Sequence, residues 1–367
     1  MTPIPSPSNP PGNDRDARRR SVWKKYLGFT LKIAVAAGIV GFLFRNPREI
    51  VDCFRHFDFR YLAPALVCYG AHIFVCAWRW RELAKIIGVH FRPLEAVSLT
   101  FQGNMFSLVI PGGAIGGDVV KMGAVTRRSA TGSKTEGAFT VLMDRIVGMI
   151  ALFSLELAIL VPAIPLLMRV SFPELALDAR TKQLGILLLA LLAVAGLAAS
   201  GVIFFHRFIE KIPPFGRLMR WGDNVTHGTV SRLTAATDTY SASWRKLVLL
   251  TLASIFFVHL MTVLPMCFLL AGLGLEFRIF DVIVAVTIGN IIGLLPIFPG
   301  GVGGRDVAAV TLLAAAGIDV PDAKTAQLIY TALILFYGLL GAVFMVCDPG
   351  RKLDGGDGKA EDRPERK

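Results

Sequence analysis

Six charged residues interrupt segments of the chain that are otherwise strongly apolar. They are Asp118, Lys121, Asp144, Arg145, Arg305 and Asp306. Ionisable side chains within apolar spans are costly, and they usually face an interior cavity or pair with one another. Such a cavity could bind an anionic head group, with the Lys and Arg side chains attracting the anion and the Asp side chains positioning those cations. Alternatively, the opposite charges pair only to stabilise the fold.

Two segments rich in Pro and Gly contain three of these charges and stand just before a fourth, Lys121. PGGAIGGDV occupies 111–119 and PGGVGGRDV occupies 299–307. We expect each segment to end one half-helix, with Asp118 or Asp306 beginning the next, because Pro and Gly are poor helix formers. The free N–H groups and partial positive charge at a half-helix N-terminus favour an anion such as phosphate. The two Asp side chains could equally be helix caps.

Asn104 and Asn290 occupy equivalent places in the apolar segments before the two Pro-Gly-Gly elements. A buried amide needs hydrogen-bond partners, which could be the broken backbone or a substrate. The candidate substrate-binding side chains from this reasoning are Asn104, Asp118, Lys121, Asp144, Arg145, Asn290, Arg305 and Asp306.

Three further polar residues, His72, Glu156 and His259, lie within apolar runs. A lone intramembrane His or Glu can relay protons. A hydrogen bond to a neighbouring helix is the more common role for such a side chain, so both interpretations stay open.

The composition requires that these residues be held by membrane helices. The chain is 54% hydrophobic and 18% charged, and its apolar residues gather in runs of about twenty, the length that a helix needs to cross a bilayer. The net charge of +12 comes from Lys and Arg between these runs, which indicates membrane orientation and not nucleic-acid binding. The five Cys have no metal-ligand spacing, so no metal site is expected.

The basic clusters at 17–25, 79–92, 121–134 and 207–246 are expected on the cytoplasmic side. This predicts an all-α polytopic membrane protein with about six spanning helices, at 26–44, 61–78, 138–168, 184–205, 247–272 and 326–347, and two re-entrant broken-helix hairpins within 94–120 and 280–317. Both termini are then cytoplasmic. We expect a membrane domain over 26–347, disordered tails over 1–25 and 348–367, and a basic interfacial segment over 207–246.

The two hairpins resemble each other in sequence. GVHFRPLEAVSLTFQGN (88–104) matches GLEFRIFDVIVAVTIGN (274–290), and PGGAIGGDV (111–119) matches PGGVGGRDV (299–307) at nearly the same offset along the chain. The predicted path brings the first copy in from the cytoplasm and the second from outside. We therefore expect inverted repeats over about 61–168 and 247–347, with the site at the membrane midplane between them.

Motifs of soluble chemistry are incomplete in this sequence. GSKT (132–135) lacks the upstream Gly of a phosphate-binding loop, and GGVGG (300–304) lacks the full dinucleotide fingerprint. No zinc-protease motif or nucleophile elbow is present. We expect neither a cofactor nor a catalytic centre.

The stretches GNMFSLVIPGGAIGGDVVKM, VLMDRIVGMIAL and IGNIIGLLPIFPGGVGGRDVAAV resemble the flippase-like membrane region of lysylphosphatidylglycerol synthases and its stand-alone relatives, over roughly 26–347. The resemblance implies a protein of the cytoplasmic membrane that moves lipids or lipid-linked sugars between leaflets. By motif match it adds to the candidate substrate-binding residues the positions Pro111, Gly112, Gly113, Gly117, Pro299, Gly300, Gly301 and Gly303. Two positions depart from the family pattern: Lys121 stands where relatives often have Arg, and 326–347 carries no basic residue. The soluble aminoacyl-transfer domain of bifunctional relatives is not expected here.

Three functions are therefore open. The first is a transporter that moves an anionic lipid between leaflets, the second is a membrane partner that presents lipid to an envelope glycosyltransferase, and the third is an enzyme acting on lipid phosphates. Membrane lipids are the expected partners in each case, and the sequence leaves the lipid, the coupling ion and the oligomeric state undetermined.

Overall fold

The computed structural model describes residues 55–109, 114–128, 134–171, 178–204, 229–294 and 303–347. These residues form helices and connecting turns and contain no strand, so the expected all-α fold is confirmed. The apolar run 26–44, both terminal tails, residues 207–228 of the basic segment and the candidate residues Pro111, Gly112, Gly113, Pro299, Gly300 and Gly301 lie outside the described residues.

Within the described residues, five helical elements are long and apolar enough to cross a membrane. They are η1 (Phe59–Tyr61) with α3 (Leu62–Ile86), α6 (Lys134–Leu167), α7 (Ala179–Phe204), the continuous element α11 (Trp244–Ser254), η2 (Ile255–His259) and α12 (Leu260–Gly272), and α15 (Val320–Cys347). Each candidate span has at least 23 residues, more than the about 20 that an apolar core of about 30 Å requires. The chain is a multi-pass membrane protein, and these elements correspond to five of the six spans expected from sequence.

Five shorter helices complete the described fold. They are α4 (Pro93–Val109), α5 (Ala114–Arg128), α10 (Thr229–Ala242), α13 (Ile279–Gly293) and α14 (Gly304–Ala315). α4 packs against α5, and α13 packs against α14. At about 1.5 Å per residue, none of these four reaches the about 30 Å of an apolar membrane core. Each Pro-Gly-Gly segment thus joins two short helices that lie together.

Two sequence-based boundaries were wrong. α3 continues to Ile86 and includes Arg79, which was expected in a basic loop, because the Arg79 guanidinium finds partners inside the protein. α5 already runs from Ala114, so Asp118 lies in its second turn and not at its beginning. α14 does begin close to the expected point, at Gly304.

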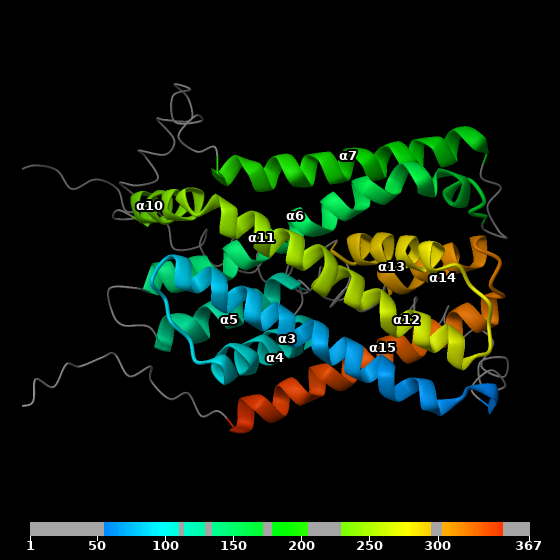
Figure 1. The fold of residues 1–367 in the computed structure, drawn as a ribbon, viewed down its shortest axis with the longest axis horizontal. Helices are drawn as coiled ribbons and strands as arrows, with labels where there is room; N and C mark the ends of the chain where they lie inside the picture. Colours follow the sequence, from blue (N-terminus) through cyan, green and yellow to red (C-terminus); the bar gives the residue numbers. More distant parts are fainter. Residues whose placement is uncertain are drawn as a thin grey trace, which may run out of the picture.

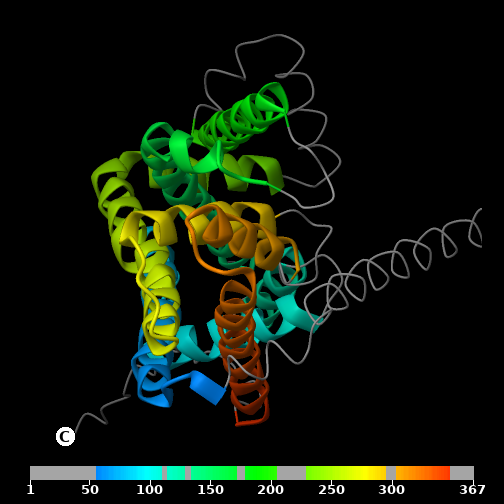
Figure 2. The ribbon, with the colours of Figure 1, turned by 90° about the vertical axis from the view of Figure 1, so that its right-hand side faces the viewer.

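Helices from distant parts of the chain pack side by side, several of them in opposite directions. The Asp58 N–H donates to the Gly272 carbonyl, 2.7 Å away, at one end of the α3 contact with α11–η2–α12, and Arg79 contacts Ser254 further along. α3 and α12 are therefore antiparallel neighbours, as Figure 1 and Figure 2 also show. α4 packs along α15, and α13 packs along α6. α6 and α15, which follow the two short helix pairs, run in opposite directions (Figure 1).

The boundaries of the helices recur along the chain. α3 ends at Ile86 and α12 at Gly272, while α4 begins at Pro93 and α13 at Ile279, so both boundaries repeat at the interval that relates 88–104 to 274–290. The turns between them contain Gly88 and Gly274, with φ of 76° and 70°. Gly is favoured at both because its lack of Cβ permits positive φ. The sequence similarity is thus accompanied by the same local backbone structure.

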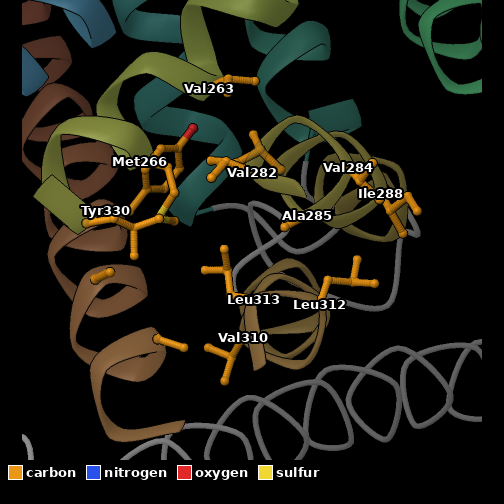
Figure 3. Packing of buried hydrophobic residues seen from close by; sticks show 14 of the residues in the cluster. Val263, Met266, Val282, Val284, Ala285, Ile288, Val310, Leu312, Leu313 and Tyr330 are labelled. Atoms are coloured by element: carbon orange, nitrogen blue, oxygen red, sulfur yellow. The ribbon is translucent and has the colours of Figure 1, made fainter. Parts of the chain in front are cut away.

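Among the described residues, the largest cluster of buried apolar side chains lies among the second half of α6 and the helices α12, α13, α14 and α15. Figure 3 shows Met266, Val282, Leu313 and Tyr330 in this cluster, with α13 and α14 side by side. Close contact of side chains is the main driving force between helices in lipid, because lipid tails are as apolar as Leu. This packing fixes the position of the second short helix pair.

α7 lies at the edge of the molecule beside α6 (Figure 1). Its apolar side chains Leu184, Leu187, Leu188 and Val194 are each more than half exposed. Exposed apolar residues over a whole helix face are expected where lipid tails replace water. α7 therefore presents a lipid-facing surface.

Candidate functional site

Five charged side chains from three helices line one cavity of about 220 Å³. They are Arg79 of α3, Asp118 and Lys121 of α5, and Asp144 and Arg145 of α6. The remaining wall includes Asn104 of α4, Val258 and His259 of η2, and Leu294 just after α13. The cavity therefore lies between the helices α3 to α6 on one side and η2 with the end of α13 on the other. The structure brings together four charged candidates of the first repeat and adds Arg79.

Arg145 and Asp118 form an ion pair with two contacts. Nε and Nη2 of Arg145 donate to the two carboxylate oxygens of Asp118, each at 2.8 Å. The Arg145 side chain keeps 35% of its surface exposed and the Asp118 side chain 22%. This geometry uses the planar fork of guanidinium, which matches carboxylate and phosphate equally well. Asp118 is thus a partner of Arg145 and does not cap a helix, contrary to the capping alternative.

Asp144 is held between Arg79 and Lys121. Arg79 Nε donates to Asp144 Oδ1 at 2.8 Å, and Arg79 Nη1 donates to Ser254 Oγ at 3.1 Å. Lys121 Nζ lies 3.9 Å from Asp144 Oδ2 and 3.8 Å from the centre of the Trp80 ring. The Arg79 and Lys121 side chains are almost completely buried. Their burial is tolerable because each is paired with a carboxylate, and Lys121 also has a cation–π contact.

Arg79 is the charged residue that our sequence reasoning missed. It stands directly after an apolar run and before Arg81 and Lys85, so it resembled an orienting loop residue. A usable signal was present, because Arg79 is followed by Trp80 and a helical pattern that continues to Ile86. An Arg inside a helix that crosses the membrane needs a buried carboxylate, and Asp144 was available.

The cavity wall carries more positive than negative charge. Arg79, Lys121 and Arg145 face two carboxylates, those of Asp118 and Asp144. Lys121 is at 3.9 Å from its nearest carboxylate oxygen among the described pairs, beyond ordinary hydrogen-bond length. The surplus charge can be balanced by an anion that enters the cavity.

Glycines allow α4 and α5 to approach closely beside this cavity. A side chain on Gly117 would collide with the Gly103 carbonyl oxygen and with the Ser107 hydroxyl. A Cβ on Gly103 would lie 3.7 Å from the Lys121 side chain. Small residues let membrane helices pack with their backbones close. The predicted site residue Gly117 therefore sets the spacing of the helices that carry Asn104 and Lys121, and Asn104 is exposed to the cavity.

Arg305 and Asp306 form a buried pair whose carboxylate oxygens both accept hydrogen bonds from neighbouring groups. Arg305 Nη2 donates to Asp306 Oδ1 at 3.0 Å, and the same oxygen accepts from Gln327 Nε2 at 2.7 Å and Thr331 Oγ1 at 3.0 Å. Oδ2 of Asp306 accepts from the Gly303 N–H at 2.9 Å. Only 1% of Asp306 is exposed. Asp306 thus caps α14 and ties it to α15, in agreement with the capping alternative.

Positions that the internal sequence similarity relates to each other make different contacts. Asp306 aligns with Asp118. The offset along the chain from Arg145 to Thr331 is nearly the same, so Thr331 is the equivalent of Arg145. Asp118 binds Arg145, whereas Asp306 accepts from the neutral Thr331. Asn290, equivalent to Asn104, donates to Thr262 Oγ1 at 3.4 Å. The charged residues 118–145 therefore face a cavity, whereas Asp306 and Asn290 are bonded to neighbouring side chains.

The remaining polar residues of the apolar runs have separate environments. His72 Nδ1 is 3.1 Å from the Val258 carbonyl oxygen, and His259 Nε2 is 3.1 Å from that of Gly148. Both histidines line the cavity and bond to neighbouring helices. Glu156 is buried on α6 and has no hydrogen-bond partner among the described residues. Within those same residues, no group of three or more His, Cys, Asp or Glu could hold a metal ion.

Two comparisons place this chain among known proteins. The family described as the lysylphosphatidylglycerol synthase TM region matches residues 29–341. A UPF0104 membrane protein of Pyrococcus horikoshii is 21% identical over 328 residues, which cover 88% of this chain and 97% of that protein. The family match covers all the helices that line the cavity.

Proposed function

Because the chain belongs to the family of lysylphosphatidylglycerol synthase transmembrane regions, we propose that it moves an anionic lipid, or a lipid-linked sugar with an anionic head group, between the leaflets of the cytoplasmic membrane. The observation that carries the proposal is the cavity with three cations and two carboxylates between the helices α3 to α6 and η2 with the end of α13. A phosphate head group supplies the balancing negative charge.

The arrangement of the helices supports transport. α3 lies antiparallel to α12, and α6 runs opposite to α15 (Figure 1). Transporters with inverted repeats bind substrate between the repeats and alternate access by moving one against the other. On this proposal the repeats span about 61–168 and 247–347, the pairs α4–α5 and α13–α14 are re-entrant from opposite faces, and both termini are cytoplasmic.

Arg145 is the first contact for the head group on this proposal. It is the most exposed of the three cavity cations, and its fork can bind a phosphate with two parallel hydrogen bonds. The phosphate replaces Asp118 on one or both guanidinium nitrogens, and Lys121 adds a point charge deeper in the cavity. Arg79 and Asp144 stay paired and hold α3 against α6.

Competition between Asp118 and the phosphate for Arg145 explains how the head group can be released. Since Asp118 competes with phosphate for the same guanidinium, the bound lipid is held by the difference between two similar interactions and not by the full strength of either. A transporter requires such limited affinity, because a head group bound too tightly would not leave. The acyl chains meanwhile stay in the bilayer.

A vesicle assay with the purified protein tests the proposal. Fluorescent phosphatidylglycerol placed in one leaflet should become accessible in the other with the wild-type protein, and Arg145→Ala should reduce the rate about ten- to a hundredfold, the cost of losing a charge-assisted pair. Arg145→Lys should restore only part of the rate, because Lys lacks the planar fork. Arg278→Ala, an exposed Arg before α13, is the matched control and should have no effect.

Other outcomes of the same assay reject the proposal in defined ways. Lipid movement that requires an added glycosyltransferase would assign the chain an accessory role. Chemical change of the lipid by the purified chain would make it an enzyme. An equal rate in wild-type protein and Arg145→Ala would remove the cavity from the mechanism.

A further inference from the structure

Glu156 is an unpaired carboxyl group in the interior of a membrane helix. It lies on α6, its exposed fraction is 0%, and neither of its oxygens has a hydrogen-bond partner among the described residues. The buried carboxylate of Asp306 differs, because it accepts five hydrogen bonds from its surroundings. Asp144 is likewise paired, with Arg79. Glu156 therefore needs an explanation that these paired carboxylates do not.

Glu156 lies on the same face of α6 as the residues that line the cavity. The residues of α6 that line the cavity recur at the helical repeat: Asp144 and Arg145, Gly148 and Met149, then Leu152. Glu156 is the next residue of that series, one turn beyond Leu152 and about 6 Å further along the helix axis. It thus lies on the cavity-facing side of α6, past the last residue of this helix that lines the cavity.

An apolar layer separates Glu156 from the cavity. Leu152 packs with Phe153, Ala193 and Ile291, all nearly or fully buried. This cluster joins α6 to α7 and to the C-terminal end of α13. On α6, Leu152 stands between the cavity and Glu156, so opening of the Leu152–Ile291 cluster would let cavity water approach Glu156. Such a contact is an apolar barrier of the kind that alternating access would break and remake.

The titratable groups around α6 lie elsewhere and have other partners. His259 of η2 bonds to Gly148, two turns before Glu156, and Arg305 and Asp306 of α14 bond to each other. Arg79 of α3 and Lys121 of α5 contact Asp144, three turns before Glu156. The stretches 186–197 of α7 and 282–291 of α13 carry no titratable residue, and Arg180 and Lys182 stand at the beginning of α7. Among the described ion pairs, none includes Glu156.

A carboxyl group in these surroundings holds a proton. An ionised carboxylate without a counter-ion or a hydrogen-bond donor is strongly disfavoured in an apolar interior, and the neutral acid is the form that burial selects. If the apolar layer opened and water reached the group, the ionised form would become accessible. The same side chain would then release its proton to that water and take one up again before the layer closes.

We propose that Glu156 is the proton-binding site that couples proton movement to lipid movement. The coupling rests on the function proposed above, whereas the proton-binding site itself does not. In the closed arrangement Glu156 is protonated behind the layer of Leu152 and Ile291. Opening of the layer on one side exchanges the proton with water, and the same rearrangement changes access to the cavity one turn away.

Infrared difference spectroscopy of the whole protein in vesicles tests proton binding without any transport. The wild-type protein at neutral pH should show the C=O stretching band of a protonated carboxyl group, and Glu156→Gln should lack this band. Gln has nearly the same shape as a neutral Glu, so the variant should fold. Glu276→Gln, at an exposed Glu before α13, is the control and should keep the band. A band that persists in Glu156→Gln would overturn the proposal.

Lipid movement under an imposed pH gradient tests the coupling. The wild-type rate should increase severalfold when the gradient is applied, and Glu156→Gln should show no increase while it retains movement without a gradient. If the wild-type protein moves lipid and the gradient has no effect, the coupling is rejected and the proposed function stands. If the wild-type protein moves no lipid but shows the carboxyl band, the function fails and the proton site stands. A gradient effect that survives in Glu156→Gln rejects Glu156 as the coupling group.

Discussion

Arg145 donates two hydrogen bonds of 2.8 Å to the carboxylate of Asp118, across the interface between α5 and α6. At the position equivalent to Arg145 stands the neutral Thr331, which donates to Asp306. The guanidinium on Asp306 comes instead from its chain neighbour Arg305, on the same helix. The equivalent residues Asp118 and Asp306 therefore have different roles. In the first repeat the pair faces a cavity that can accept an anion, and in the second the carboxylate is fully used in joining helices.

Replacing Asp118 should strengthen anion binding. Asp118→Asn removes the negative charge that competes for Arg145, so a short-chain phosphatidylglycerol should bind about tenfold or more tightly, in line with the strength of a hydrogen bond to a charged group. Titration calorimetry in detergent measures this. Asp281→Asn, at the beginning of α13, should leave the affinity unchanged. Weaker binding by Asp118→Asn would mean that Asp118 contacts the ligand or is needed to position Arg145.

Breaking the buried pair of Arg79 and Asp144 should destabilise the protein. Asp144→Asn leaves the Arg79 guanidinium buried without its counter-ion, and removal of one partner from such a pair costs about 3–5 kcal/mol. The midpoint of thermal unfolding in detergent should fall clearly. The double variant Arg79→Met with Asp144→Leu should recover much of the loss, because it leaves no unpaired charge. A double variant as unstable as Asp144→Asn would contradict this account.

Gly117 and Gly123 lie on the same helix and should respond oppositely to Ala. Gly117→Ala forces a methyl group against the Gly103 carbonyl and the Ser107 hydroxyl, so α4 and α5 must separate and stability must fall. Gly123→Ala meets nothing within 4 Å and should raise stability by up to about 1 kcal/mol through better helix propensity. Unfolding midpoints of the two variants give the comparison, and equal midpoints would show that the close approach does not matter.

Asp306→Asn should reduce stability but not the intrinsic rate of lipid movement. The variant loses the charge that accepts from Arg305, Gln327 and Thr331, and one disrupted buried network of charge-assisted bonds typically costs several kcal/mol. Lipid movement should be measured per folded molecule, after size-exclusion chromatography. A strong loss of rate in protein that is fully folded would place Asp306 in the transport mechanism and argue against a structural role.

The sequence alone was sufficient to predict the helical membrane fold. Five of the six expected spans correspond to long helices in the described residues, and the charges of 118–145 do gather in one place. These predictions succeed because hydropathy and helix length are local properties that the bilayer enforces. The similarity of 88–104 to 274–290 was also visible in the sequence, and helix boundaries such as Pro93 and Ile279 recur at the same interval as the residues.

The tertiary structure decided which charges became partners. Arg79 and Asp144 lie far apart in the sequence, and only the packing of α3 on α6 brings them together. It also decided that Asp118 binds Arg145 while Asp306 caps α14, although both follow nearly identical Gly-rich segments. Hydropathy sets how many helices cross the bilayer, but the pairing of buried charges depends on which helix faces meet, and that is a property of the whole fold.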